Sequence, residues 1–181
     1  MRTFIRYSAL LLLLVTFAFG VEGAVTAIHG TITKVDRAAK TVVVKTADGT
    51  EHTLHFAGKT TVRGADLTAR GAKESFHGLK EGTEVVAHYT KRGGKDTAVE
   101  LDKVGKDGLK GTEGTISVVD RTGKKIAVTT ADGTKQTFKL SDHAVQDAGT
   151  DIGKGSEKGT KVIVYSSEDA GKKVAHFFEK I

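Results

Sequence analysis

An internal repeat constrains the fold of this chain more than any other feature of its sequence. Residues 30–56 recur as residues 114–140 at a constant offset of 84, and 14 of the 27 aligned positions are identical. A second block, residues 82–103, recurs as residues 159–180 at an offset of 77. Repetition over such a length indicates two copies of one structural unit.

The change of offset means that the second copy has lost residues between the two blocks. Because insertions and deletions collect in surface loops, we predict that residues 57–81 and the shorter residues 141–158 form loops or a brief helix. Residues 105–113 are rich in Gly, Lys and Asp and are predicted to be a linker. Copy one then spans residues 25–104, and copy two spans residues 114–181.

Within each copy, apolar and polar residues alternate with the period of two that is typical of a half-buried strand. Asp48 and Gly49 form a hairpin signal between two such runs, because both residue types tolerate the positive φ of tight turns. Ile32 and Val35 are three apart, which breaks the alternation and predicts a β-bulge. The pattern predicts five strands in copy one, at residues 30–36, 40–46, 50–56, 83–89 and 95–104.

Three strands, a connector and two further strands are the order of an OB-like barrel. An SH3-like barrel is the alternative, because strand order alone does not fix how the sheet closes. We therefore predict an all-β protein with two tandem, small five-stranded OB-like barrels. The residues predicted to fill the two interiors are Phe56, Leu140, Val85, Val99, Leu101, Val162, Val164 and Phe178.

The N-terminus has the three parts of a signal peptide. Arg2 and Arg6 precede an apolar run of about 11 residues at positions 9–19, and the small residues Ala18 and Gly20 flank Phe19 at the expected cleavage site. A membrane-spanning helix needs about 20 apolar residues, so we predict removal of residues 1–20, or cleavage as late as residue 23, and no integral membrane span. The chain contains no cysteine, which excludes disulfides and a lipid-modified N-terminus.

Several of the repeated residues resemble a widespread family of bacterial exported small β-barrel domains of unknown function. The resemblance rests on residues 30–32, on Val35, Asp36 and Lys40, on Val42 and Val44, and on residues 47–49 and 79–83. It covers nearly all of both copies. It implies an OB-like fold and a location in the cell envelope, and it implies no activity.

Seven histidines in a chain without cysteine raise the question of a metal site. His52 and His55 are three apart on a predicted strand, so they point to opposite faces and do not bind one ion together. The histidines do not recur between the copies, as the alignment of His176 with Val99 illustrates. We therefore predict ordinary surface or barrel-end histidines, with no metal site and no cofactor.

The repeated acidic residues do not form a catalytic pattern. Asp36 and Asp48 recur as Asp120 and Asp132, but each lies at a hairpin end, where Asp commonly bonds its own backbone. The hairpin loops are too short to form the sides of a substrate pocket. We therefore predict no catalytic residues, no enzyme activity and no small-molecule substrate.

The mature chain is mildly basic, because removing Arg2 and Arg6 lowers the net charge from +6 to +4. The aromatic residues fall mostly at core positions, so they are not available for stacking on bases. The outer face of the second and third strands is basic in both copies, which indicates either a solvated surface or a polyanion-binding face. The contacts of such a face would include Lys45, His55, Lys125, Lys135 and Lys139.

Together these patterns favour an exported, non-catalytic structural or protein-binding module of the cell envelope, located in the periplasm or secreted. The alternative is binding of a polyanion, such as nucleic acid, lipopolysaccharide or an acidic glycan. The partner would be an unidentified envelope protein or an anionic polymer. Any recognition surface is expected on the long connector of copy one, residues 62–79, where Phe76 is predicted to plug the open end of the barrel.

Overall fold

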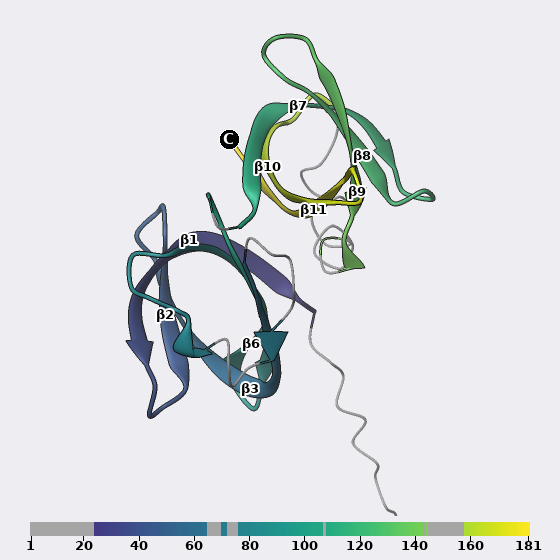
Figure 1. Ribbon diagram of the computed structural model, residues 1–181. Helices are drawn as coiled ribbons and strands as arrows, with labels where there is room; N and C mark the ends of the chain where they lie inside the picture. The colour runs from purple at the N-terminus through teal and green to yellow at the C-terminus, as the bar shows by residue number, and fades with distance from the viewer. Residues whose placement is uncertain (1–23, 65–69, 72–75, 107, 143, 145–157) are drawn as a thin grey trace, which may run out of the picture.

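The computed structural model describes residues 24–64, 70–71, 76–106, 108–142, 144 and 158–181, and most of them lie in β-strands. The strands form two rings, one from each copy of the repeat (Figure 1). Barrel one contains β1 (Thr26–Asp36), β2 (Thr41–Thr46), β3 (Glu51–Arg63), β4 (Arg70–Gly71), β5 (Glu84–Arg92) and β6 (Lys95–Lys103). Barrel two contains β7 (Lys110–Asp120), β8 (Lys125–Thr129), β9 (Lys135–Leu140), β10 (Lys161–Asp169) and β11 (Lys172–Lys180).

Both barrels close by the same topology. In barrel one, β1 pairs antiparallel with β2 and β5, β2 with β3, and β5 with β6. Barrel two repeats these pairings among β7, β8, β9, β10 and β11. In each barrel a parallel pairing completes the ring, β3 with β6 and β9 with β11. The two-residue β4 pairs only with the end of β3 and is not part of the ring. The prediction of two tandem five-stranded OB-like barrels is confirmed.

The predicted bulge is present in the first strand of both copies. The register of β1 against β2 shifts between Ile32 and Lys34, and that of β7 against β8 shifts between Ile116 and Val118. The extra residue bends the strand and increases its twist. This bend lets one strand pair with two neighbours and helps a small sheet to close.

The predicted hairpin turns are also confirmed. Gly49 and Gly133 have φ values of 87° and 82°. In the first turn, Asp48 accepts hydrogen bonds from the Thr46 hydroxyl and from the backbone N–H and hydroxyl of Thr50. These bonds, that from Thr46 first, hold the pKa of Asp48 below its usual value. The pKa of Asp132 is lowered in the same way, because the repeat preserves the turn.

The two glycines that open the repeated motif lie where strands pass closest together. A Cβ atom on Gly30 would lie 2.4 Å from the carbonyl oxygen of Lys45. A Cβ atom on Gly114 would lie 2.5 Å from Val128 Cγ1 and 2.6 Å from the carbonyl oxygen of Thr129. Contacts this short exclude a side chain, which explains why both copies have glycine here.

Each barrel has its own apolar core. Ile32, Val42, Val44, Leu54, Val85 and Leu101 are among the fully buried residues of barrel one. Ile116, Ile126, Val128, Phe138, Val162 and Val164 are among those of barrel two. Of the predicted interior residues, Phe56 and Phe178 are only partly buried.

The prediction that Val99 fills the interior is wrong. Val99 is half-buried, and it is the extra residue of a bulge, because His88 pairs with Glu100 while Tyr89 pairs with Ala98. Ala98 and Leu101 point into the core instead. The bulge therefore shifts the alternation of β6 by one residue between these two core positions.

The structure also differs from the predicted connections. Residues 57–63, expected in a loop, continue β3, and a short helical turn follows at Phe76 and His77. Residues 110–113, expected in the linker, begin β7 and pair with β10. Most of the shorter connector of copy two, like part of the expected recognition surface at residues 62–79, lies outside the described residues.

Candidate functional site

The two barrels meet through an apolar seam. Val86 from barrel one, Leu109 from the connection and Tyr165 from barrel two are buried together. Val104, Ile163 and Phe177 pack against them. The connection itself is anchored, because the backbone N–H of Leu109 donates a 2.7 Å hydrogen bond to the carbonyl oxygen of Lys103. Burial of this seam holds the barrels against each other.

Both barrels contribute the same strand pair to this junction, β5 and β6 in barrel one and β10 and β11 in barrel two. The repeat offset of 77 makes the junction residues equivalent positions of the two copies. The two barrels therefore face each other at the junction through equivalent surfaces. The equivalent positions are His88 and Tyr165, Glu100 and Phe177, and Asp102 and Glu179.

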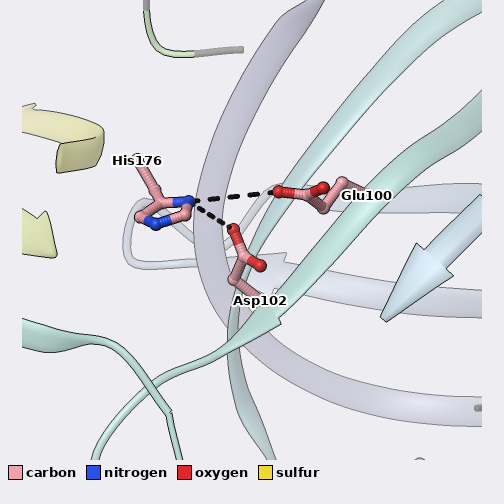
Figure 2. Close-up of side chains that lie close together, drawn as sticks. All are labelled: Glu100, Asp102 and His176. Atoms are coloured by element: carbon pink, nitrogen blue, oxygen red, sulfur yellow. Dashed lines mark ion pairs between the residues drawn. The ribbon is translucent and has the colours of Figure 1, made fainter. Parts of the chain in front are cut away.

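A buried cluster of acidic and histidine side chains lies at this junction. Glu100, Asp102 and His176 have relative exposures of 2%, 0% and 3%. Figure 2 shows the imidazole of His176, from barrel two, facing the carboxylates of Glu100 and Asp102, from barrel one. His176 Nδ1 lies 3.4 Å from Asp102 Oδ2 and 4.0 Å from Glu100 Oε1.

A bulge in β11 places His176 in this cluster. Tyr165 pairs with Phe177 and Ser166 with Ala175, so His176 is the residue without a partner in the β10–β11 ladder. It occupies the position that Val99 occupies in barrel one. Bulges commonly redirect a side chain, and this one directs the imidazole toward the other barrel.

The cluster is supported by neighbours on both sides. Arg63 Nη2 lies 3.1 Å from Glu100 Oε2, which also accepts a 3.2 Å hydrogen bond from the Thr61 hydroxyl. The Ser167 hydroxyl lies 2.9 Å from His176 Nε2. Within the described residues, three buried atoms of the cluster have no hydrogen-bond partner: both carboxylate oxygens of Asp102 and Nδ1 of His176. Buried polar atoms in this condition are uncommon in folded proteins, and they occur where there is strain, a functional role, or a bound water or ion.

A second polar network crosses the junction. His29 Nε2 lies 2.7 Å from Glu84 Oε1, and His29 Nδ1 lies 3.1 Å from both the Tyr165 hydroxyl and Glu179 Oε2. Tyr165 donates a 2.8 Å hydrogen bond to Glu179. Burial, with the hydrogen bond to Glu179, raises the pKa of Tyr165 well above its usual value, so the hydroxyl stays protonated. This network is satisfied by its own members.

A pocket lies at one end of barrel one. Its volume is about 380 Å³, and the described residues that line it are Arg37, Lys40, Phe56, Ala57, Gly58, Phe76 and His77. The rings of Phe56 and Phe76 meet edge to face at 4.7 Å. Phe76 is 7% exposed and belongs to the core of barrel one, in keeping with the predicted plug. The pocket combines apolar walls with the exposed cationic side chains of Arg37 and Lys40.

The interpretation of all histidines as surface or barrel-end residues is wrong for two of them. His88 and His176 are buried at the junction, with exposures of 0% and 3%. His52 and His55 are half-buried, His77 is exposed, and His143 lies outside the described residues. Sequence reasoning also missed Glu100 and Asp102, because acidic residues on either side of Leu101 look like the solvent face of a strand.

The structure brings together only some of the predicted polyanion contacts. Lys125 pairs directly with Lys139 across β8 and β9, and Lys135 lies farther along β9, opposite Thr129. Lys45 and His55 belong to barrel one, where Lys45 pairs with the acidic Glu51 and His55 with Thr41. The basic face is therefore concentrated on barrel two.

Comparisons with known proteins assign no family to this chain. No family model matches it, and no curated protein matches it. Among solved structures, it is similar to a CusF variant with Cu(II), residues 10–88, from Escherichia coli, with a TM-score of 0.34 and 11% identity, covering 45% of this chain and 94% of that chain. A likeness of this size assigns neither a family nor a function.

Among the described residues there is no helix with the length and apolar character that crossing a membrane requires.

Proposed function

We propose that this chain is an exported, non-catalytic module of the cell envelope that binds another protein through the pocket of barrel one. The signal-peptide pattern of residues 1–20 supports export. The non-catalytic role is supported by the burial of Glu100, Asp102 and His176, whose exposures of 3% or less keep them from a substrate in solution. The pocket formed around Phe56 and Phe76 is the observation that carries the binding proposal.

The lining of the pocket indicates the chemistry of its occupant. Two phenylalanine rings offer an apolar surface, and aromatic anchors dominate the energy of protein interfaces. Arg37 and Lys40 add positive charge beside this surface. The volume of about 380 Å³ lies within the usual range of ligand pockets. The occupant we propose is a partner segment that presents an apolar side chain next to a carboxylate.

Selection of peptides from a random display library on the mature chain tests this proposal. The selected peptides should be enriched in an apolar residue next to Asp or Glu. Phe76→Ala and Arg37→Glu should each weaken their binding by at least about tenfold, because one removes an apolar wall and the other reverses a charge. Affinities measured by fluorescence anisotropy check this expectation.

The repeat supplies a matched control for the charge reversal. Arg121 is the barrel-two equivalent of Arg37, so Arg121→Glu should leave peptide affinity unchanged. Peptides without the expected composition, or peptides that bind all three variants as they bind the unaltered chain, would contradict the proposal.

A second candidate function is polyanion binding by barrel two. Lys125 and Lys139 are direct cross-strand neighbours, and like charges in this position destabilise a sheet. An anion between them would relieve the repulsion. A polar pocket of about 390 Å³ at the junction adds Lys106, Lys110 and Lys173 to the basic surface, with Glu168 as its acidic member.

Duplex DNA serves as a polyanion probe for this second function. The Lys125→Gln/Lys139→Gln double variant should bind it more weakly, and the slope of log affinity against log salt should fall by about 1 for each lost contact. Lys45→Gln is the control, because Lys45 lies across from the acidic Glu51 in the β2–β3 ladder rather than across from another lysine. Equal salt dependence of the double variant and the unaltered chain would rule out this function.

A further inference from the structure

We propose that Glu100, Asp102 and His176 form a binding site for one divalent transition-metal cation of the Zn²⁺ class, which joins the two barrels. The three side chains each offer one ligand atom, and these atoms lie within 4.8 Å of one another. The site is independent of the barrel-one pocket, and it adds a metal to a chain for which sequence patterns predicted none.

The spacing of the ligand atoms suits a small cation. With metal–ligand bonds of about 2.0–2.1 Å, two ligands of a tetrahedral ion lie about 3.3 Å apart. His176 Nδ1 and Asp102 Oδ2 are 3.4 Å apart, and His176 Nδ1 and Glu100 Oε1 are 4.0 Å apart. A small movement of the Glu100 carboxylate therefore brings all three atoms within bonding distance of one ion.

The hydrogen bonds around the cluster hold the ligand atoms in place. Ser167 Oγ contacts Nε2 of His176, which leaves Nδ1 facing the carboxylates. Arg63 contacts Oε2 of Glu100, and Oε1 of the same carboxylate lies 4.0 Å from His176 Nδ1. Metal-binding histidines commonly bond their second ring nitrogen to a nearby polar group in this way.

The charge balance of the cluster also favours a cation. Arg63 Nη2 lies 3.1 Å from Glu100 Oε2, but the groups around Asp102 are more distant: Arg63 Nε and His88 Nε2 at 3.9 Å and His176 Nδ1 at 3.4 Å. Both oxygens of Asp102 are without a hydrogen-bond partner in the described part of the chain, and a buried charge that is not hydrogen-bonded is costly. A bound divalent ion would supply positive charge at this position.

The donor set identifies the class of metal. Two carboxylate oxygens and one imidazole nitrogen suit Zn²⁺, Mn²⁺ or Fe²⁺, whereas Cu⁺ prefers the sulfur of Cys and Met. The chain has no cysteine, and its one methionine is Met1. We name Zn²⁺ as the probe because it takes both His nitrogen and Asp/Glu oxygen ligands and is bound in some sites by three protein ligands.

The test uses the mature two-barrel chain, purified without a histidine tag and stripped of metal with a chelator. Zn²⁺ is titrated in competition with a chromogenic chelator, and native mass spectrometry gives the stoichiometry. We expect one Zn²⁺ per chain. Asp102→Asn and His176→Gln should each weaken the apparent affinity by at least about 100-fold, because each removes a ligand.

Two variants serve as controls. Glu179→Gln alters the neighbouring His29–Tyr165–Glu179 network, and His77→Gln removes an exposed histidine; both should bind Zn²⁺ as the unaltered chain does. Circular dichroism checks that each variant is folded. Glu100→Gln is the further ligand variant if either of the first two fails to fold, because the amide oxygen can still accept hydrogen bonds from Arg63 and Thr61.

Thermal unfolding gives a second readout. Zn²⁺ should raise the unfolding midpoint of the unaltered chain and of both controls, because an ion that binds only the folded state stabilises it. The ligand variants should show no such rise. The proposal is overturned if Zn²⁺ does not bind at one per chain, if the ligand variants bind it with unchanged affinity, or if His176 and the two carboxylates form only an ion pair that Zn²⁺ does not stabilise.

Discussion

Phe138→Ala should unfold barrel two under conditions where the unaltered chain is fully folded. Phe138 is 0% exposed and lies in the core of barrel two with Ile116, Ile126 and Val128. Truncating a buried phenylalanine costs about 3–5 kcal/mol, because apolar burial is lost and a cavity remains. The total stability of a small domain is about 5–15 kcal/mol, so this one change removes a large share of it.

Urea unfolding followed by hydrogen exchange with mass spectrometry checks this result, because the peptides report on each barrel separately. In the Phe138→Ala variant, protection of backbone amides from hydrogen exchange should be lost first in residues 110–142. Val118→Ala is the matched control, since Val118 lies on β7 of the same barrel but is 43% exposed. Its effect should stay within about 0.5 kcal/mol. Equal effects of the two truncations would mean that Phe138 does not fill the core as described.

Gly114→Ala should destabilise barrel two by about 1–3 kcal/mol or more, as overpacking commonly does. The added methyl group would lie 2.6 Å from the carbonyl oxygen of Thr129. A backbone atom in a paired strand has little freedom to move, so β7 and β8 must separate. Gly30→Ala should destabilise barrel one for the same reason, since its contact with the Lys45 carbonyl oxygen would be 2.4 Å.

Gly58→Ala provides the comparison for both glycine variants. Gly58 also lies in a strand, β3, but a Cβ atom there would have no neighbour within 4 Å. Alanine at such a position restricts the unfolded chain and should stabilise the protein by about 0.4–1 kcal/mol. Chemical denaturation of the three variants measures these differences. If Gly114→Ala were as stable as Gly58→Ala, the close approach of β7 and β8 would be wrong.

The barrels were predictable because their determinants are local. Alternation over Val42 and Val44, the Asp48–Gly49 turn and the three-residue spacing of Ile32 and Val35 each act within a few residues. Because the same patterns recur in the second copy, each strand and turn could be predicted from two sequences. The prediction weakened at Val99, because a bulge changes which residues face the core without altering the average polarity of the strand.

The buried cluster was not predictable in the same way, because it forms between barrels. Glu100 and Asp102 alternate with the core residue Leu101, a pattern typical of a strand with one face in solvent. In the folded chain His176 of barrel two faces these two carboxylates, which are buried. The one available signal was the alignment of His176 with Val99, which marks a position where an apolar residue in one copy is a polar, titratable residue in the other.

The use of equivalent surfaces on both sides of the junction has a consequence for assembly. Two separate barrels meeting through this surface would have to find each other in solution, whereas the connection at residues 104–109 keeps them together at an effective concentration of the order of millimolar. Weak mutual affinity is then sufficient. A position can then change in one barrel alone, as at His88, whose equivalent in barrel two is Tyr165. Tethering therefore lets the two equivalent surfaces diverge in sequence while the barrels stay together.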